Sequence, residues 1–257
     1  MKIKNNRISI FISKKNKEFK KNEKNYKQEN QIMFQKNFLG WLLKTFKISK
    51  RELNEQKFQI LKVKKNMKLL LLGCGLGDEV IYLDNKYKKM KIKFYYQDIS
   101  KIMTEYAFRN IFKKKINCKY VVSSSDKLPF KKDFFDGIFH FGGINLFKNP
   151  RNSLLEMLRV TKNKGQIIYG DEGIGTWLRQ STYSKILINN NKLWSAKPLL
   201  EILPFKSKHI KLSWILENCF YLISFHKDKD FPNINLKIKH KSPRGGSIYS
   251  RYKKNSL

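Results

Sequence analysis

The sequence predicts an α/β protein with a doubly wound, mostly parallel sheet of seven strands that ends in an antiparallel hairpin. Two observations lead to this prediction. Between residues 68 and 170, short apolar runs alternate with segments of helical periodicity, as they do in repeated strand–helix–strand units. Two later apolar runs are separated only by Glu217-Asn218-Cys219, a connection typical of a hairpin. With 257 residues, 41% of them hydrophobic, the chain can bury the core of one such domain.

The segment before the sheet is expected to have two parts. Residues 1–30 are rich in Lys and Asn with little apolar periodicity, which predicts a basic, disordered arm. Residues 31–66 are predicted to form a helical cap, because Phe38 and Trp41 belong to a set of apolar residues at helical spacing.

The main domain is predicted to cover residues 67–227, and a basic tail follows at 228–257. Strands joined by intervening helices run parallel, because each helix carries the chain back across the sheet. The expected parallel strands are 68–72, 92–97, 119–122, 137–141 and 166–170, with helices from about residue 78, at 102–112 and at 153–161. The expected hairpin strands are 210–216 and 220–225.

The formal net charge of +35 leaves two interpretations open. Basic side chains neutralise phosphates, so nucleic acid or an anionic membrane surface could be a partner. However, only eight of the 55 basic residues are Arg, and Lys, Asn and Ile share AT-rich codons, so genome drift is favoured over a nucleic-acid surface. The sequence contains no apolar run of membrane-spanning length and no signal peptide. The three cysteines lack metal-ligand spacing, which predicts reduced thiols, no metal site and a cytoplasmic protein.

The first functional motif is the turn Gly73-Cys74-Gly75-Leu76-Gly77, which follows the apolar strand at 68–72. Glycines allow a tight turn and close approach of the backbone to a ligand at the carboxyl edge of a sheet. A dinucleotide-binding loop would place its third glycine at residue 78, where this chain has Asp78. A carboxylate there would repel a pyrophosphate, so the spacing favours a nucleoside without one.

The second motif is Asp98, at the end of the next predicted strand and 25 residues after Gly73. A carboxylate at this position can accept hydrogen bonds from both ribose hydroxyls of a nucleoside. The alternative is local, since either Asp98 or Ser100 could cap the following helix.

Further segments follow in a characteristic order. They are Ser123-Ser124-Ser125-Asp126-Lys127-Leu128-Pro129-Phe130, then Phe134-Phe135-Asp136, then Glu156-Met157-Leu158-Arg159-Val160 with Gly165. Together with the glycine turn and Asp98-Ile99-Ser100, they resemble the class I methyltransferases, in the branch that includes enzymes of ubiquinone and menaquinone biosynthesis. The resemblance covers residues 68–171. It implies a Rossmann-like fold, methyltransferase activity and S-adenosylmethionine as the cofactor.

The resemblance also implies roles for individual residues. Gly73, Gly75 and Gly77, with Cys74 between them, would pass under the methionine and ribose. Asp98 would hold the ribose, Ile99 would pack on the adenine, and Ser124 and Ser125 would meet the adenine edge. Phe139, His140 and Phe141 would line the pocket near the sulfonium. Leu71 and Ser124 depart from the family, which has acids there, and Asp78 and Asp126 could partly substitute for them.

Methyl transfer from a sulfonium requires a positioned acceptor, and it requires a base only if the acceptor must lose a proton. His140 is the candidate base, and a role in shaping the pocket is the alternative. Asp171 and Glu172 end the fifth strand on the same edge, where they could contact a ligand or cap a helix.

A small-molecule acceptor is expected, with residues 174–205 as its lid. Trp177, Tyr183 and Trp194 suit an apolar acceptor, and they equally suit plain packing. Phe141-Gly142-Gly143-Ile144 lacks the Asn-Pro-Pro-Tyr type of motif that holds a base amine. A nucleic-acid methyltransferase and a non-catalytic binding paralogue remain the alternatives.

Overall fold

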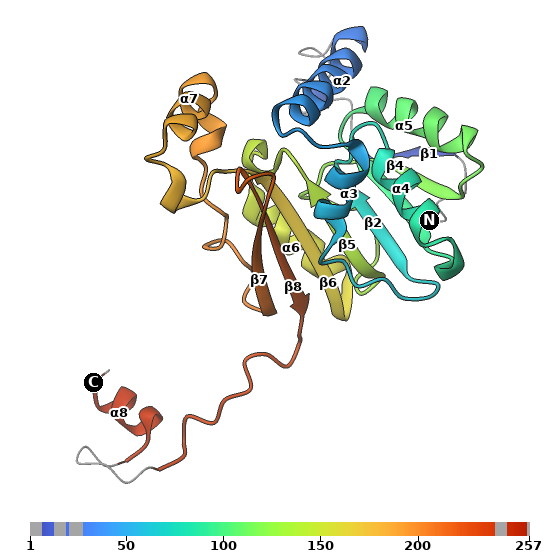
Figure 1. Cartoon of the computed structure of the whole chain (residues 1–257). Coiled ribbons are helices and arrows are strands. Elements are labelled where there is room, and N and C mark those ends of the chain that lie inside the picture. Colours follow the sequence, from blue (N-terminus) through green and yellow to red (C-terminus); the bar gives the residue numbers. More distant parts are fainter. Residues whose placement is uncertain (1–6, 13–18, 21–27, 240–245, 256–257) are drawn as a thin grey trace.

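The computed structural model describes residues 7–12, 19–20, 28–239 and 246–255. The strands in this part of the chain are β1 (Ile8–Ile10), β2 (Lys68–Leu72), β3 (Lys93–Asp98), β4 (Cys118–Val122), β5 (Phe135–Phe141), β6 (Thr161–Glu172), β7 (Ser207–Ile215) and β8 (Phe220–Lys227). They form one sheet in the order β1-β4-β3-β2-β5-β6-β8-β7 (Figure 1). Strands β1 to β6 pair in parallel, whereas β8 is antiparallel to both β6 and β7. The predicted parallel sheet and its final hairpin are confirmed.

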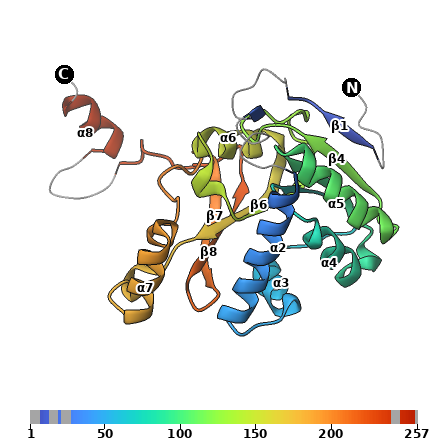
Figure 2. The same ribbon diagram turned by 90° about the horizontal axis from the view of Figure 1, so that it is seen from above.

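The helices lie on both faces of the sheet, as a doubly wound fold requires (Figure 2). They are α2 (Gln28–Thr45), α3 (Lys50–Phe58), α4 (Asp78–Lys86), α5 (Lys101–Lys113), α6 (Pro150–Val160), α7 (Thr182–Asn190) and α8 (Ile248–Asn255). Short 3-10 turns are η1 (Lys88–Met90), η2 (Ile144–Leu146), η3 (Thr176–Leu178) and η4 (Lys192–Ser195). Side chains from α2, α3, α4 and α5 pack on one face, and those of α6 pack on the other. In the described ranges, no helix has the length and apolar character needed to cross a bilayer.

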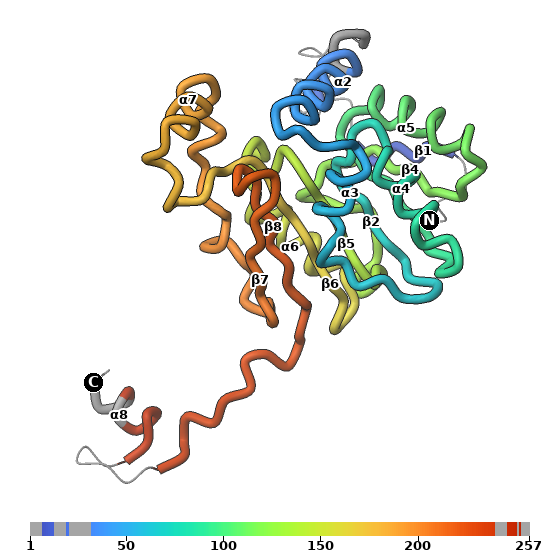
Figure 3. Tube along the Cα trace, viewed as in Figure 1, coloured from blue at the N-terminus to red at the C-terminus, as the bar shows by residue number. Residues whose placement is uncertain are grey.

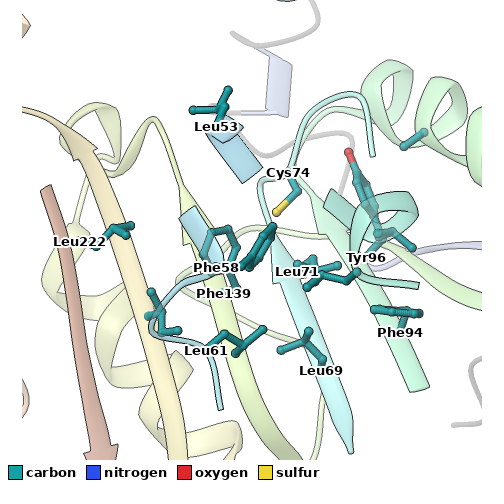
Figure 4. Close-up of a cluster of buried hydrophobic side chains, with 14 of the residues drawn as sticks. Leu53, Phe58, Leu61, Leu69, Leu71, Cys74, Phe94, Tyr96, Phe139 and Leu222 are labelled. Atoms are coloured by element: carbon teal, nitrogen blue, oxygen red, sulfur yellow. The ribbon is translucent and has the colours of Figure 1, made fainter. Parts of the chain in front are cut away.

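Strand β2 shows why this sheet needs helices on both faces. Leu69 and Leu71 point into the cluster under α3 to α5, whereas Leu70 and Leu72 point toward α6, and all four are buried. Figure 4 shows the first cluster, in which Phe58 of α3 and Phe139 of β5 meet with ring centroids 4.3 Å apart. A strand buried on both faces reads as a continuous apolar run, which is why the sequence identifies β2 so clearly.

Strand β1 differs from the prediction, because it lies within the arm at residues 1–30 that the sequence indicates to be disordered. It pairs in parallel with the edge of β4, with Ile8 opposite Tyr120, and the N–H of Phe11 donates to the Val122 carbonyl at 2.8 Å. The sequence analysis did not predict this strand, and in the described part of the chain the sheet has eight strands. Three residues are too few to show a periodic pattern, and pairing with a distant strand overrides the polar composition around them. Most of the remaining arm lies outside the described residues.

The segment at 174–205 forms η3, α7 and η4, followed by an irregular stretch. Figures 1 and 2 place α7 beside the end of β6, on the same edge of the sheet as α2. Residues Leu199, Ile202 and Leu203 return to the sheet and pack against the cluster under α6.

Candidate functional site

The three glycines of the turn between β2 and α4 serve different purposes. Gly73, Gly75 and Gly77 all have positive φ, at 60°, 49° and 82°, a region that favours glycine. At Gly77 a Cβ would lie 2.9 Å from the Cδ1 atom of Ile111, so this glycine lets α5 pack close. At Gly75 the nearest atoms to a Cβ, from Gln35 and Met103, would be 3.8 Å away. A Cβ would therefore fit at Gly75 without a clash, and it is the positive φ that favours glycine there.

Asp98, at the end of β3, lies directly beside this turn. The Tyr96 hydroxyl donates to the Gly75 carbonyl at 2.6 Å and lies 3.4 Å from Asp98 Oδ2. The Asp98 side chain is only 9% exposed, and burial raises its pKa to about 6 although backbone N–H groups, including that of Gly75, oppose this shift. Hydroxyl donors from a ligand would favour its charged form.

The alternative of a helix cap is assigned to the neighbouring Ser100. Its side chain accepts from the Met103 N–H at 3.3 Å and is the N-cap of α5, while Asp98 Oδ1 accepts from the Ser100 N–H at 2.9 Å. Asp98 thus orients the cap without being the cap.

His140, at the end of β5, packs against the turn between β2 and α4. Its Nδ1 donates to the Leu72 carbonyl at 2.8 Å, and a Cβ on Gly73 would come within 3.3 Å of the imidazole ring. Nε2 is buried with no hydrogen-bond partner in the described part of the chain, and burial lowers the pKa of this histidine. His140 is therefore a buried imidazole with a lowered pKa that is bonded to the backbone at the start of the turn.

The segment after β4 also lies next to Asp98, as the sequence predicts. The Ser123 N–H donates to the Asp98 carbonyl at 3.1 Å, and Gln97 Nε2 donates to the Ser123 carbonyl at 2.6 Å. Ser124 is buried, and the Ser125 and Ser153 hydroxyls are 2.8 Å apart. Ile99 is half-buried and Asp126 is exposed.

Two predicted site residues belong to the core instead. Phe139 is fully buried against Phe58, so its side chain packs below the carboxyl edge of the sheet (Figure 4). Cys74 is buried, and its thiol donates to the Leu72 carbonyl at 3.5 Å. Phe141, the last residue of β5, is half-buried at the edge itself. Among the described residues no group of His, Cys, Asp or Glu could hold a metal ion.

The sequence analysis missed two features beneath the turn. The buried Lys57 of α3 forms an ion pair with the partly buried Glu79 of α4, and its ammonium lies 5.0 Å from the centroid of the Phe141 ring. Nothing in the sequence marks residues 22 positions apart on different helices as partners. Tyr96 could have been found, because it precedes Asp98 by two residues in a strand and so shares its face.

Asp171 and Glu172 hold the loop that follows β5. The Asp171 carboxylate accepts from the N–H groups of Gly143, at 3.0 Å, and Asn145, at 2.7 Å. The Glu172 carbonyl accepts from Asn145 Nδ2 at 3.0 Å. Burial and the adjacent Asp171 carboxyl raise the pKa of Glu172. The Asp171 carboxylate thus caps the η2 turn, because the N–H groups that donate to it lie at the start of this turn.

Aromatic rings connect α2 with the end of β5, and we call them the aromatic path. Successive centroids are 5.2 to 6.4 Å apart, and the path consists of Phe34, Phe38, Trp41, Trp194, Phe220 and Phe141. Its outer end, Phe34, is 60% exposed, and its inner end is next to the Lys57–Glu79 pair. Trp194 is buried in it, whereas Trp177 is exposed with its ring against Trp214, and Tyr183 is exposed on α7.

Residues 70–169 match a protein family described as a methyltransferase domain. No curated protein sequence matches the chain. Among solved structures, the chain is similar to Haemonchus contortus phosphoethanolamine N-methyltransferase 2 in complex with S-adenosyl-L-methionine, with a TM-score of 0.56 and 14% identity. The similarity covers 69% of this chain and 53% of that enzyme, so this chain spans about half the length of the enzyme.

A second similar structure is a Methanococcus maripaludis protein provisionally assigned as an S-adenosyl-L-methionine-dependent methyltransferase. Its TM-score is 0.58 at 17% identity, over 85% of this chain and 98% of that one. At these identities the structures show a shared fold, and the family match covers the segment from β2 to β6. Residues 70–169 therefore match a methyltransferase domain, and the chain shares the fold of S-adenosyl-L-methionine-dependent methyltransferases.

Proposed function

We propose that this protein transfers a methyl group from S-adenosylmethionine to an apolar or aromatic small-molecule acceptor. The observation that carries the proposal is the aromatic path, which runs from exposed Phe34 to Phe141 at the carboxyl edge of the sheet. Phe141 follows His140, whose ring touches the glycine turn, so the path ends beside the cofactor residues. Trp194 and Phe220 are buried within the path, so an apolar acceptor would contact its exposed rings, Phe34 and Trp41, which would shield it from water and orient it.

Several residues at the turn fit the cofactor. The backbone at Gly75 has positive φ and lies beside Asp98, a buried carboxylate that two ribose hydroxyls would stabilise. Ser124 and Ser125 would face the adenine, with Ile99 packing on its ring. When bound, the cofactor supplies a methyl group already activated by the positive sulfonium.

The protein's contribution is then mainly to position the acceptor and exclude water. His140 acts as a positioning residue, because it fixes the Leu72 carbonyl and the back of Gly73. Gly73 and Gly77 shape the turn, and residues 174–205 form part of the acceptor lid. All three cysteines are buried free thiols, which supports a cytoplasmic location.

Nucleic acid is the second candidate acceptor, and the net charge of +35 is the observation in its favour. The loop after β5 supports the small molecule instead. Phe141-Gly142-Gly143-Ile144 contains no polar side chain to hold a flipped base, and Asp171 is already bonded to the loop backbone.

The test combines cofactor binding with methyl transfer. Calorimetry of the full chain should give heat of binding for S-adenosylmethionine, and labelled methyl groups should appear in the organic-solvent fraction of a cell extract. Total RNA and DNA are offered in parallel at physiological salt, because non-specific binding to a basic protein falls steeply with salt.

Phe34→Ser tests the aromatic path, because Phe34 is exposed and its loss should leave the fold intact. We expect a higher KM for the acceptor and an unchanged Kd for the cofactor. The control is Phe112→Ser, an exposed ring of α5 that stacks on Phe108 outside the path. Label recovered at one mapped position in nucleic acid, or equal effects of the two variants, would overturn the choice of acceptor.

A further inference from the structure

The chain beyond β8 has an unusual composition. After Asp230 the sequence contains no Asp or Glu through residue 257, while seven residues are Lys or Arg. Apolar and polar residues alternate in Ile234-Asn235-Leu236-Lys237-Ile238-Lys239, and two of the three polar ones are lysine. All the charged side chains of this segment are positive, and apolar side chains recur between them.

The structure shows that this segment leaves the domain. Asp228 and Lys229 anchor its start to the domain. The buried Asp228 carboxylate pairs with Lys164 at 2.6 Å and Lys208 at 3.2 Å, and the Lys229 N–H donates to Asn163 Oδ1 at 3.0 Å. Beyond these contacts, the chain runs away from the sheet to α8 (Figure 3). The tail also makes contacts of its own, because the Tyr249 N–H donates to the Leu236 carbonyl at 3.0 Å and the Lys237 ammonium lies 5.7 Å from the Tyr249 ring. These contacts bring α8 next to the alternating segment.

The two parts together expose a set of large apolar side chains, which we call the tail surface. Its members are Ile234, Leu236, Ile238, Ile248, Tyr249 and Tyr252, each between 40% and 69% exposed. Lys237 and Lys239 are exposed among them. Soluble proteins seldom expose so many clustered apolar groups without a partner, so the tail surface indicates an interaction site.

We propose that the tail surface docks on an anionic lipid membrane. Isoleucine, leucine and tyrosine side chains suit insertion at the boundary between head groups and acyl chains, where tyrosine is enriched. The interleaved lysines would contact the lipid phosphates, and no acidic residue follows Asp230 to repel them. A nucleic acid would use the lysines but leave Ile234, Leu236 and Ile238 in water. The lipid surface accounts for both kinds of residue.

Co-sedimentation with vesicles tests the proposal, using the full chain without cofactor so that the result is independent of methyl transfer. The protein should bind phosphatidylcholine vesicles that contain about 30% phosphatidylserine, and bind pure phosphatidylcholine much more weakly. Lys237→Glu with Lys239→Glu should lower the partition coefficient roughly twentyfold or more. The matched control is Lys88→Glu with Lys89→Glu, an equal charge change on exposed residues of η1, which should have a much smaller effect.

The apolar contribution is tested separately. Ile234→Ser with Ile238→Ser should weaken vesicle binding, whereas Ile10→Ser with Leu155→Ser, exposed residues elsewhere, should not. Equal losses in tail and control variants would overturn the proposal, as would the absence of vesicle binding. Binding of a single-stranded RNA that depends on Lys237 and Lys239 but not on the isoleucines, without vesicle binding, would assign the tail to nucleic acid.

Discussion

Replacing Asp98 by Asn should stabilise the ligand-free protein while weakening its hold on S-adenosylmethionine. Burial raises the pKa of Asp98 from 3.8 to about 6. This difference of about two pKa units means that the ionised Asp98 carboxylate destabilises the folded state by about 3 kcal/mol. The pKa of Asp98 is higher in the folded than in the unfolded protein. This destabilisation is therefore absent below about pH 4, grows between pH 4 and 6, and is complete above pH 6.

Urea unfolding at several pH values measures this cost directly. At pH 8, Asp98→Asn should raise the free energy of unfolding by up to about 3 kcal/mol, and the gain should shrink as the pH falls toward 4. The gain is an upper limit, because the new amide places an N–H among the backbone donors that face the carboxylate. Asp126→Asn is the control, since Asp126 is exposed and its replacement should change the free energy of unfolding little.

Asp98→Asn should weaken cofactor binding although it stabilises the ligand-free protein. Loss of a charge-assisted contact costs about 1.5–3 kcal/mol, a roughly 10- to 150-fold weaker Kd by calorimetry. Wild-type affinity should also fall as the pH drops below 6, because the ribose hydroxyls then meet a protonated acid. A variant that unfolds more easily at pH 8 would refute the burial argument. Unchanged affinity would refute the ribose assignment.

Three further outcomes are expected. Lys57→Met should cost at most about 3–5 kcal/mol in urea unfolding, because the partly buried Glu79 is left without its partner. The double variant Lys57→Met, Glu79→Leu should lie near the wild type, and equal losses in the two variants would exclude the pairing argument. Tyr96→Phe removes the 2.6 Å hydrogen bond to the Gly75 carbonyl and should lower the free energy of unfolding by about 1 kcal/mol. Cofactor binding measured by calorimetry should also be weaker. If neither the stability nor the affinity changes, the turn does not need this hydrogen bond. Deletion of residues 1–12 removes β1 and should lower Tm by several degrees, and a truncated protein that melts like the full chain would show that β1 contributes nothing.

The parallel sheet could be predicted because local and global preferences agree along its central strands. The run Leu69–Leu72 is apolar on both faces and ends in glycine, so only one interpretation fits it. The same holds for Asp98, whose place at a strand end follows from the strand itself. These residues carry their structural role in the sequence around them.

Other roles depend on contacts between distant segments and could not be derived. Gly77 looks like a ligand-binding glycine in the motif, but Ile111 of α5 explains its missing side chain. Trp194 looks like a lid residue, yet the rings of Trp41 and Phe220 bury it. In each case the deciding neighbour lies tens of residues away or more, beyond the reach of periodicity or motif spacing.

The position of β1 has a consequence for the order of assembly. This strand leaves the ribosome well before its partner β4, which is synthesised more than a hundred positions later, since Ile8 pairs with Tyr120. Closing so large a loop is entropically unfavourable, and a three-residue strand returns few hydrogen bonds in exchange. The nascent chain therefore completes most of its sheet before β1 docks. In the finished protein the amides of β1 should be the first of the sheet to exchange with solvent deuterium, well before those of the central strand β2.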